Sequence, residues 1–209
     1  MNINKIFIFI DGSALNNGKK YSIGSIGIYI PEYNIKIGKL ISNINFKITN
    51  QTMELSACIE ALEIINNFND ANNDKILYIC TDSTYIINSI TKWYHKWEHN
   101  NWKTSKGSDV SNKELINKLF LLKKNKFIIF KHVKAHTVEP SKDDEDYDLW
   151  YGNYMADKLA TECSKNYKHK LKENKLNDIN KEINDHAKEQ TYEKDDIDLK
   201  MNINSLLNV

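Results

Sequence analysis

The segment KIFIFIDG, residues 5–12, decides how the rest of the sequence is interpreted. Its apolar run is almost continuous up to Ile10, and a short run of this kind, bounded by turn residues, is typical of a strand in the centre of a sheet. Asp11 and Gly12 end the run, and a turn-rich stretch at 13–20 follows. We therefore expect a central strand that delivers Asp11 to the start of a loop.

Outward from this strand, the sequence alternates between strand and helix patterns. Two more strands, 24–30 and 33–41, would complete an antiparallel meander. The next apolar residues repeat at three and four positions, which predicts a helix with one buried face that Asn50 or Thr52 caps. Further strands are expected at 75–81 and 127–133, and further helices at 83–90, 91–101, 112–124 and 153–167. This order requires a mixed sheet with helices on its faces.

The composition of the chain excludes several classes of protein. Hydrophobic residues make up 41% of the 209, which is typical of a globular protein. The net charge is +1, so any basic footprint for nucleic acid must be local. Cys58, Cys80 and Cys163 lack metal-site spacing and indicate reduced thiols in an intracellular protein, cytoplasmic or nuclear. The first apolar run is too short for a signal peptide or a membrane span, so we expect no membrane partner.

A change in composition after about residue 165 suggests a domain boundary. Lys, Glu, Asp and Asn dominate from there on, and apolar residues become sparse. We expect a domain at 1–166 and a polar tail at 167–209 that is weakly helical or disordered, because it cannot bury enough apolar surface. A helix that docks on a partner is the alternative for the tail. The protein is expected to be a monomer.

Four acidic residues stand at positions that suit a catalytic site. Asp11 and Asp82 each end a predicted strand, and such strand ends line the crevice where open α/β sheets bind ligands. Glu54 and Asp157 fall in the first turns of two helices. Each acid alone has an ordinary explanation: a turn residue, a partner of the helix dipole, a helix cap or a solvated position. The argument for a site therefore rests on the set of four.

Six ordered segments give the chain a family resemblance: FIDGS, TNQTMEL, YICTDSTYIINSI, TKWYHKWEHNNWKTS, KHVKAHT and GNYMADKLA. Together they resemble the type 1 ribonuclease H family over residues 6 to about 165. The resemblance implies a ribonuclease H-like α/β fold, with a five-stranded mixed sheet whose first three strands are antiparallel and helices on both faces. It also implies an endonuclease that cuts the RNA strand of RNA–DNA hybrids, leaving 5′-phosphate and 3′-hydroxyl ends with little sequence preference.

The resemblance also assigns roles to the acids. Asp11, Glu54, Asp82 and Asp157 would be catalytic residues that bind two Mg²⁺ ions, which Mn²⁺ could replace, and oxygen ligands suit these hard cations. His136 would move protons during turnover. The sequence departs from the family in two places. Ala135 stands where the family usually has glycine, and the loop at 137–151 is longer and more acidic than is typical.

Other matched residues would select the substrate. Asn50 and Gln51 correspond to residues that contact RNA 2′-hydroxyls, which amides can do because they both donate and accept. The expected contacts to the DNA strand are an aromatic surface for deoxyribose and a phosphate pocket, made by Tyr85, Trp93, Trp97, Thr49, Asn112 and Ser105, with Lys103 as a further candidate. Helix capping by Asn50 and a core role for the tryptophans are the alternatives. Without arginine and with Glu98 among the lysines, we expect modest affinity for hybrids.

Two other functions compete with the nuclease. A non-catalytic module that binds RNA–DNA hybrids would need none of the acids, yet all four are present with the histidine. Another enzyme of the same superfamily, such as a DNA-strand transferase or an exonuclease, would not need the TNQ and TKWYHKW segments. Because the chain opens on the catalytic strand, we expect no separate hybrid-binding domain ahead of it.

Overall fold

The computed structural model describes residues 5–42, 45–67, 75–135 and 137–207, with backbone only at 180 and 182–207. The chain divides into two compact units, Met1–Lys165 and Asn166–Val209. All five strands lie in the first unit, and the second unit is a helical continuation of the last element. Within the described residues, none of the helices combines the length and apolar character needed to cross a membrane.

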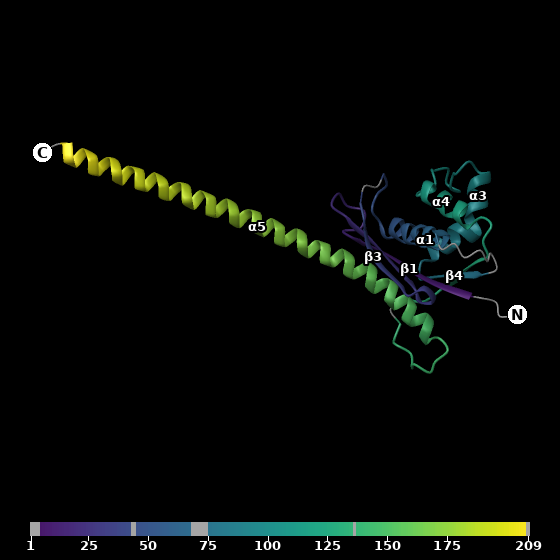
Figure 1. Cartoon of the computed structure of the whole chain (residues 1–209). Coiled ribbons are helices and arrows are strands. Elements are labelled where there is room, and N and C mark those ends of the chain that lie inside the picture. The colour runs from purple at the N-terminus through teal and green to yellow at the C-terminus, as the bar shows by residue number, and fades with distance from the viewer. Residues whose placement is uncertain (1–4, 43–44, 68–74, 136, 208–209) are drawn as a thin grey trace. The chain divides into compact units, whose positions relative to one another are not determined.

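A five-stranded mixed sheet forms the centre of the first unit (Figure 1). The spatial order of the strands is β3-β2-β1-β4-β5. The three N-terminal strands pair antiparallel, as the sequence predicts, and β4 pairs in parallel with β1 and with β5, which makes the sheet mixed. The strands are β1 (Lys5–Leu15), β2 (Ile23–Ile30), β3 (Ile35–Ile41), β4 (Ile76–Thr81) and β5 (Ile128–His132).

Helical segments connect the strands. A single 3₁₀ turn, η1, joins β2 to β3, and a π-helical turn, η2, separates the short helices α2 and α3. The segments are η1 (Pro31–Tyr33), α1 (Asn50–Asn67), α2 (Thr84–Asn88), η2 (Ser89–Trp93), α3 (Tyr94–His99), α4 (Lys113–Lys123) and α5 (Tyr147–Leu207).

The alternation of side chains along β1 supplies both faces of the sheet. Ile8 and Ile10 lie in the larger core, which they share with buried residues of α1 and α4. Phe9, on the opposite face, packs in a smaller core with Cys80 of β4 and Ala156 of α5. Helices therefore cover both faces, and β1 is buried from two sides as its continuous apolar run predicts.

Several boundaries and one cap differ from the sequence prediction. β1 continues through Asp11 to Leu15, because the turn-rich residues still pair with β2 in a long hairpin. The last helix begins at Tyr147 and not near 153, since its first turns hold a row of packed aromatic rings. Neither Asn50 nor Thr52 caps α1. Thr49 does so: its Oγ1 accepts a hydrogen bond from the backbone N of Thr52 at 3.1 Å, and the Thr52 hydroxyl accepts one from the Thr49 backbone N in return at 2.8 Å.

Two glycines allow helices to approach the central hairpin closely. A Cβ at Gly12 would lie 2.2 Å from the backbone N of Glu54 in α1. A Cβ at Gly27, which pairs with Asp11, would lie 1.9 Å from the backbone O of Ala156 in α5. Both distances are far shorter than any real contact, so only glycine permits these helix positions. The two helices are thereby brought to the segment of β1 that carries Asp11.

We expect Gly27→Ala to lower the free energy of unfolding by about 3 kcal/mol, because the added methyl group meets backbone atoms that cannot rotate away. Urea unfolding followed by circular dichroism measures the loss. Gly107→Ala is the matched control, since no atom lies within 4 Å of its Cβ position and only its φ of +81° is strained, a cost of about 1 kcal/mol. Equal losses in the two variants would contradict the close packing of α5 on β2.

Candidate active site

The parallel pairing of β1 with β4 brings the first two acids together. Phe9 of β1 pairs with Cys80 of β4, so the same register continued by two residues sets Asp11 beside Asp82. Asp11 lies within β1, whereas Asp82 directly follows β4. The order of strands and helices in the sequence permits this parallel pair, and the structure contains it.

The pKa of Asp11 shows that all four acids share one environment. It rises from 3.8 to about 7, chiefly because burial disfavours the charged carboxylate. The negative charges of Asp82, Asp157 and Glu54 raise it further, while a hydrogen bond from the backbone N–H of Gly12 lowers it. Asp82, Asp157 and Glu54, which come from three separate parts of the chain, thus all lie near enough to Asp11 to act on its carboxyl group.

Glu54 is held at the edge of this group by Ser83. Burial raises the pKa of Glu54 to about 6, the Asp82 charge adds to the rise, and the hydrogen bond that the Ser83 hydroxyl donates to Glu54 Oε2 opposes it. The same Ser83 Oγ caps α2 by accepting a hydrogen bond from the backbone N of Ile86 at 3.3 Å. Ser83, and not Asp82, is therefore the helix cap after β4.

Asp157 enters the site from α5. Its Oδ1 accepts a hydrogen bond from the Thr161 hydroxyl, one helical turn further on, at 3.2 Å. Asp157 and Asp82 both line a cavity of about 70 Å³ whose other walls include Lys134, Trp150 and Tyr154. The last helix therefore contributes both an acid and a wall of the site.

Carboxylates are the donors that Mg²⁺ prefers, so the chemistry of this set fits a divalent cation. Among the residues that the structure describes, however, no three Asp, Glu, His or Cys side chains converge closely enough to hold one ion as they stand. The carboxylates are near enough to raise the pKa of Asp11 without yet sharing a common coordination point. The four acids therefore supply the ligand type that a divalent cation needs, but their carboxylates would have to move closer together to bind one.

The histidine expected in the site, His136, lies outside the described residues. Its neighbours on β5 are described. His132 Nε2 lies 3.2 Å from the backbone O of Asp82, which ties the end of β5 to the loop that follows β4. This contact fixes the strand that leads toward residue 136.

The residues expected to contact RNA lie at the start of α1. Asn50 and Gln51 are both exposed there. Asn50 Oδ1 accepts a hydrogen bond from the backbone N of Ala14 at 3.1 Å, so this side chain links α1 to β1 and does not cap the helix. Thr49, expected in a DNA phosphate pocket, is occupied as the cap of α1.

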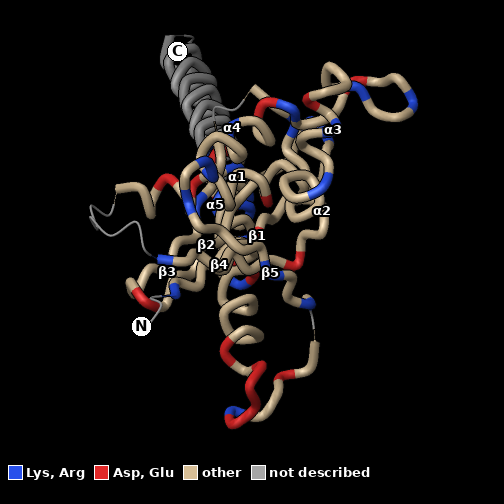
Figure 2. The backbone as a smooth tube through the Cα atoms, turned by 90° about the vertical axis from the view of Figure 1, so that its right-hand side faces the viewer, with Lys and Arg blue, Asp and Glu red and all other residues tan. Residues whose placement is uncertain are grey.

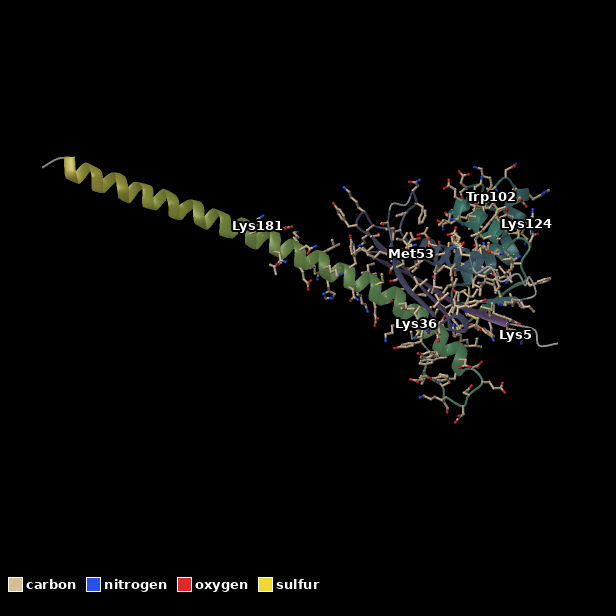
Figure 3. All side chains as sticks on the ribbon, in the orientation of Figure 1. Lys5, Lys36, Met53, Trp102, Lys124 and Lys181 are labelled. Carbon is tan, nitrogen blue, oxygen red and sulfur yellow. The ribbon has the colours of Figure 1, made fainter. Side chains whose placement is uncertain are left out.

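The aromatic residues expected to contact DNA form one cluster. The ring centroids of Tyr85 and Trp93 are 6.5 Å apart, and those of Trp93 and Trp97 are 5.4 Å apart. The π-helical turn η2 ends at Trp93, and such turns often occur at functional sites. Trp97 also packs on the core and lies 6.4 Å from Trp102, which Figure 3 shows beside α3 and α4. The structure thus gives Trp97 a core role as well.

Asn112 joins this cluster through a hydrogen bond. Its Nδ2 donates to the Tyr85 hydroxyl at 3.1 Å, from a backbone with a φ of +60° just before α4. Ser105 is exposed in a loop closed by the Lys103–Asp109 ion pair, in which Nζ and Oδ1 are 2.7 Å apart. Lys103 is therefore already neutralised in part by a neighbour.

Several residues of the site were not identified from the sequence. Ser83 and Thr161 hold two of the acids, while Lys134, Trp150, Asn153 and Tyr154 line the cavity. The four-residue spacing of Thr161 from Asp157 would have signalled one of these contacts. The contact of Ser83 with Glu54 depends on how α1 packs beside the end of β4. The cavity lining depends on the path of the loop before α5, where Figure 2 shows acidic residues gathered.

Comparison with known proteins gives consistent matches. A family model described as RNase H matches residues 3–165. The ribonuclease H of Clostridium botulinum is 36% identical over 162 residues, which cover 76% of this chain and 95% of the relative. That of Wigglesworthia glossinidia brevipalpis is 40% identical over 133 residues, covering 64% of this chain and 78% of the relative. The solved structure of LC11-RNase H1 in complex with RNA/DNA hybrid has a TM-score of 0.53 and 21% identity, covers 78% of this chain and 98% of that one, and shows the fold alone.

The raised pKa of Asp11 predicts how the stability of the metal-free protein depends on pH. Below about pH 4 the carboxyl is protonated in both the folded and the unfolded state, and above about pH 7 it is charged in both, at a cost to the fold. Stability from this group is therefore lost as the pH rises from about 4 to about 7. We expect Asp11→Asn to be more stable than the wild type at pH 8, on the order of 2 kcal/mol, and equal to it at pH 3.5.

Urea unfolding in a chelating buffer at the two pH values measures this difference. Asp109→Asn serves as a control, because that acid is exposed and paired with Lys103. An Asp11→Asn variant that gains no stability at pH 8 would contradict the burial of a charged Asp11 carboxylate beside the other three acids.

Proposed function

The chain belongs to the RNase H family, and from this membership we propose that it is an endonuclease that hydrolyses the RNA strand of RNA–DNA hybrids. The observation that carries the proposal is the convergence of Asp11, Glu54, Asp82 and Asp157 on one environment, which the pKa of Asp11 reports. The name of the relatives, ribonuclease H, supports the same substrate. A relative of the same fold has been solved with an RNA/DNA hybrid bound.

We propose that the four carboxylates hold two Mg²⁺ ions, for which Mn²⁺ can substitute. When bound, divalent cations in such a site lower the pKa of water and stabilise the charge on the attacking and leaving oxygens of a phosphodiester. The acids of this chain supply four negative charges, which two divalent cations would neutralise. That neutralisation would also relieve the repulsion that raises the pKa of Asp11.

The residues around the acids have positioning roles in this proposal. Ser83 orients Glu54 through its hydrogen bond and also fixes the start of α2. Thr161 orients Asp157. Two of the four acids are thus held by hydroxyl groups, one from the cap of α2 and one from the next turn of α5, which reduces the reorganisation needed on binding. His136 is proposed to move a proton to or from the reacting oxygens, leaving 5′-phosphate and 3′-hydroxyl products.

Recognition of the hybrid is proposed to divide between two surfaces. Exposed amides of Asn50 and Gln51 beside Glu54 would contact the RNA 2′-hydroxyls. The rings of Tyr85, Trp93 and Trp97 would pack on the deoxyriboses of the DNA strand, which present no 2′-hydroxyl. Contacts of both kinds involve sugars and carry little sequence information, so cleavage would be largely independent of sequence.

We also propose that the protein is a monomer and acts inside the cell. Its three cysteines are unpaired in the structure, and Cys58 and Cys80 are buried. Buried free thiols at these positions are compatible with a reducing compartment.

We expect Asp82→Asn to lose hybrid cleavage by roughly 10³-fold or more, because a cation site typically contributes several kcal/mol to the transition state. Cleavage of a labelled RNA strand in Mg²⁺ measures the loss, and fluorescence anisotropy measures hybrid binding, which should change little. Asp109→Asn, an exposed acid far from the set in sequence, is the matched control. Binding without cleavage by the wild type, in Mg²⁺ and in Mn²⁺, would favour a non-catalytic hybrid-binding module instead.

We expect Trp93→Ala to raise KM for a hybrid by about tenfold with a smaller effect on kcat, since aromatic packing on nucleotides is worth about 1–3 kcal/mol. Steady-state kinetics on a hybrid of fixed length measures both constants. Tyr21→Ala, which removes a ring that is 77% exposed, is the control. An unchanged KM for Trp93→Ala would contradict the proposed packing of the aromatic cluster on the DNA strand.

A further inference from the structure

The first turns of α5 carry a row of aromatic rings beside the acids. Trp150 and Tyr154 stack almost in parallel, with centroids 5.4 Å apart and an angle of 6° between the planes, and Tyr147 lies 6.0 Å from Trp150. Trp150 Nε1 donates a hydrogen bond to the backbone O of Thr137 at 3.2 Å, which fixes the orientation of the indole. Tyr154 remains 43% exposed, so the row ends in an accessible ring.

Trp150 and Tyr154 of this row line the cavity that Asp82 and Asp157 share. The cavity has a volume of about 70 Å³, which is too small for a nucleotide but sufficient for a phosphate or part of a ribose. Its lining combines a cation, an amide, a hydroxyl and aromatic rings with the two acids: Lys134, Asn153, Thr137, Trp150, Tyr154, Asp82 and Asp157. Such a mixture matches a ribonucleotide, which has an anionic phosphate, a hydroxyl and a flat base.

Asn153 brings an amide group to the same cavity. It is only 7% exposed and lines the cavity together with Lys134 and Tyr154. An amide can donate to and accept from a ribose hydroxyl at the same time.

We propose that this cavity is a subsite for the RNA nucleotide adjacent to the scissile phosphate, an inference that rests on the proposed function. Lys134 binds the phosphate of that nucleotide, and Asn153 binds its 2′-hydroxyl. The base lies outside the small cavity on the exposed Tyr154 ring, which Trp150 supports from behind. The segment between β5 and Asp157 thereby adds a contact to the RNA strand.

The acidic residues of the same segment are consistent with this arrangement. Asp144 and Asp146 line a neighbouring cavity of about 430 Å³ that shares Lys134 and Trp150 with the first. Carboxylates there repel a phosphate backbone, whereas Lys134 attracts it. Lys134 lines both cavities and is therefore within reach of a phosphate at the smaller one.

The first experiment measures KM and kcat of Tyr154→Ala and Lys134→Met on a hybrid. Both side chains are exposed, so both variants should fold, and thermal unfolding checks this. We expect KM to rise about tenfold for each with kcat within a few-fold, from the lost stacking and phosphate contacts. Tyr21→Ala and Lys124→Met, which change exposed residues outside the site (Lys124 is labelled in Figure 3), should leave KM unchanged.

The second experiment tests the 2′-hydroxyl. The substrate is a hybrid in which a short run of ribonucleotides within DNA confines cleavage to one bond, and the nucleotide next to that bond is made 2′-deoxy. The wild type should bind this strand less tightly by anisotropy in Ca²⁺, and Asn153→Ala should lose the difference. If the wild type cuts hybrids but KM is unchanged in Tyr154→Ala and Lys134→Met, the subsite is wrong and the proposed function stands.

If the wild type does not cut hybrids, the proposed function is wrong. The anisotropy measurement on the 2′-deoxy strand then still tests the subsite.

Discussion

The contact of two helices with the central hairpin at Gly12 and Gly27 is the constraint on which the rest of the site depends. Any side chain at these positions would overlap backbone atoms of α1 or α5. Because Gly12 follows Asp11 and Gly27 pairs with it, both helices arrive at the same acid from opposite faces of the sheet. Glu54 of α1 and Asp157 of α5 therefore both come close to Asp11, although they are far apart in the sequence.

Such an arrangement works against the stability of the folded chain. Burial and mutual repulsion raise the pKa of Asp11 to about 7 and that of Glu54 to about 6. Hydroxyl groups of Ser83 and Thr161 offset part of the cost by donating hydrogen bonds to two of the acids. Proteins retain unfavourable groups of this kind at functional sites, where a cation or substrate supplies the missing charge. Here the large apolar core on the α1 side of the sheet provides the stability that the site gives up.

The segment between β5 and Asp157 shapes one side of the site. It carries acidic residues, extends α5 by two turns beyond the predicted start, and places Trp150 and Tyr154 beside Asp82 and Asp157. The hydrogen bond from Trp150 to Thr137 anchors the segment to the helix. A chain with a net charge of only +1 and no arginine has few strong phosphate contacts, so additional aromatic and lysine contacts near the cut gain importance.

The sequence by itself determined the order of strands and helices, the mixed sheet and the four acids, because the apolar periods and the six motifs are local properties of the chain. It misplaced the end of β1, the cap of α1 and the start of α5, since each depends on pairing or packing with a distant segment. Only the tertiary structure decided that Ser83 holds Glu54 and that Asn153 and Tyr154 face the acids. These contacts join residues from different elements, and no spacing along the chain encodes the distances between them.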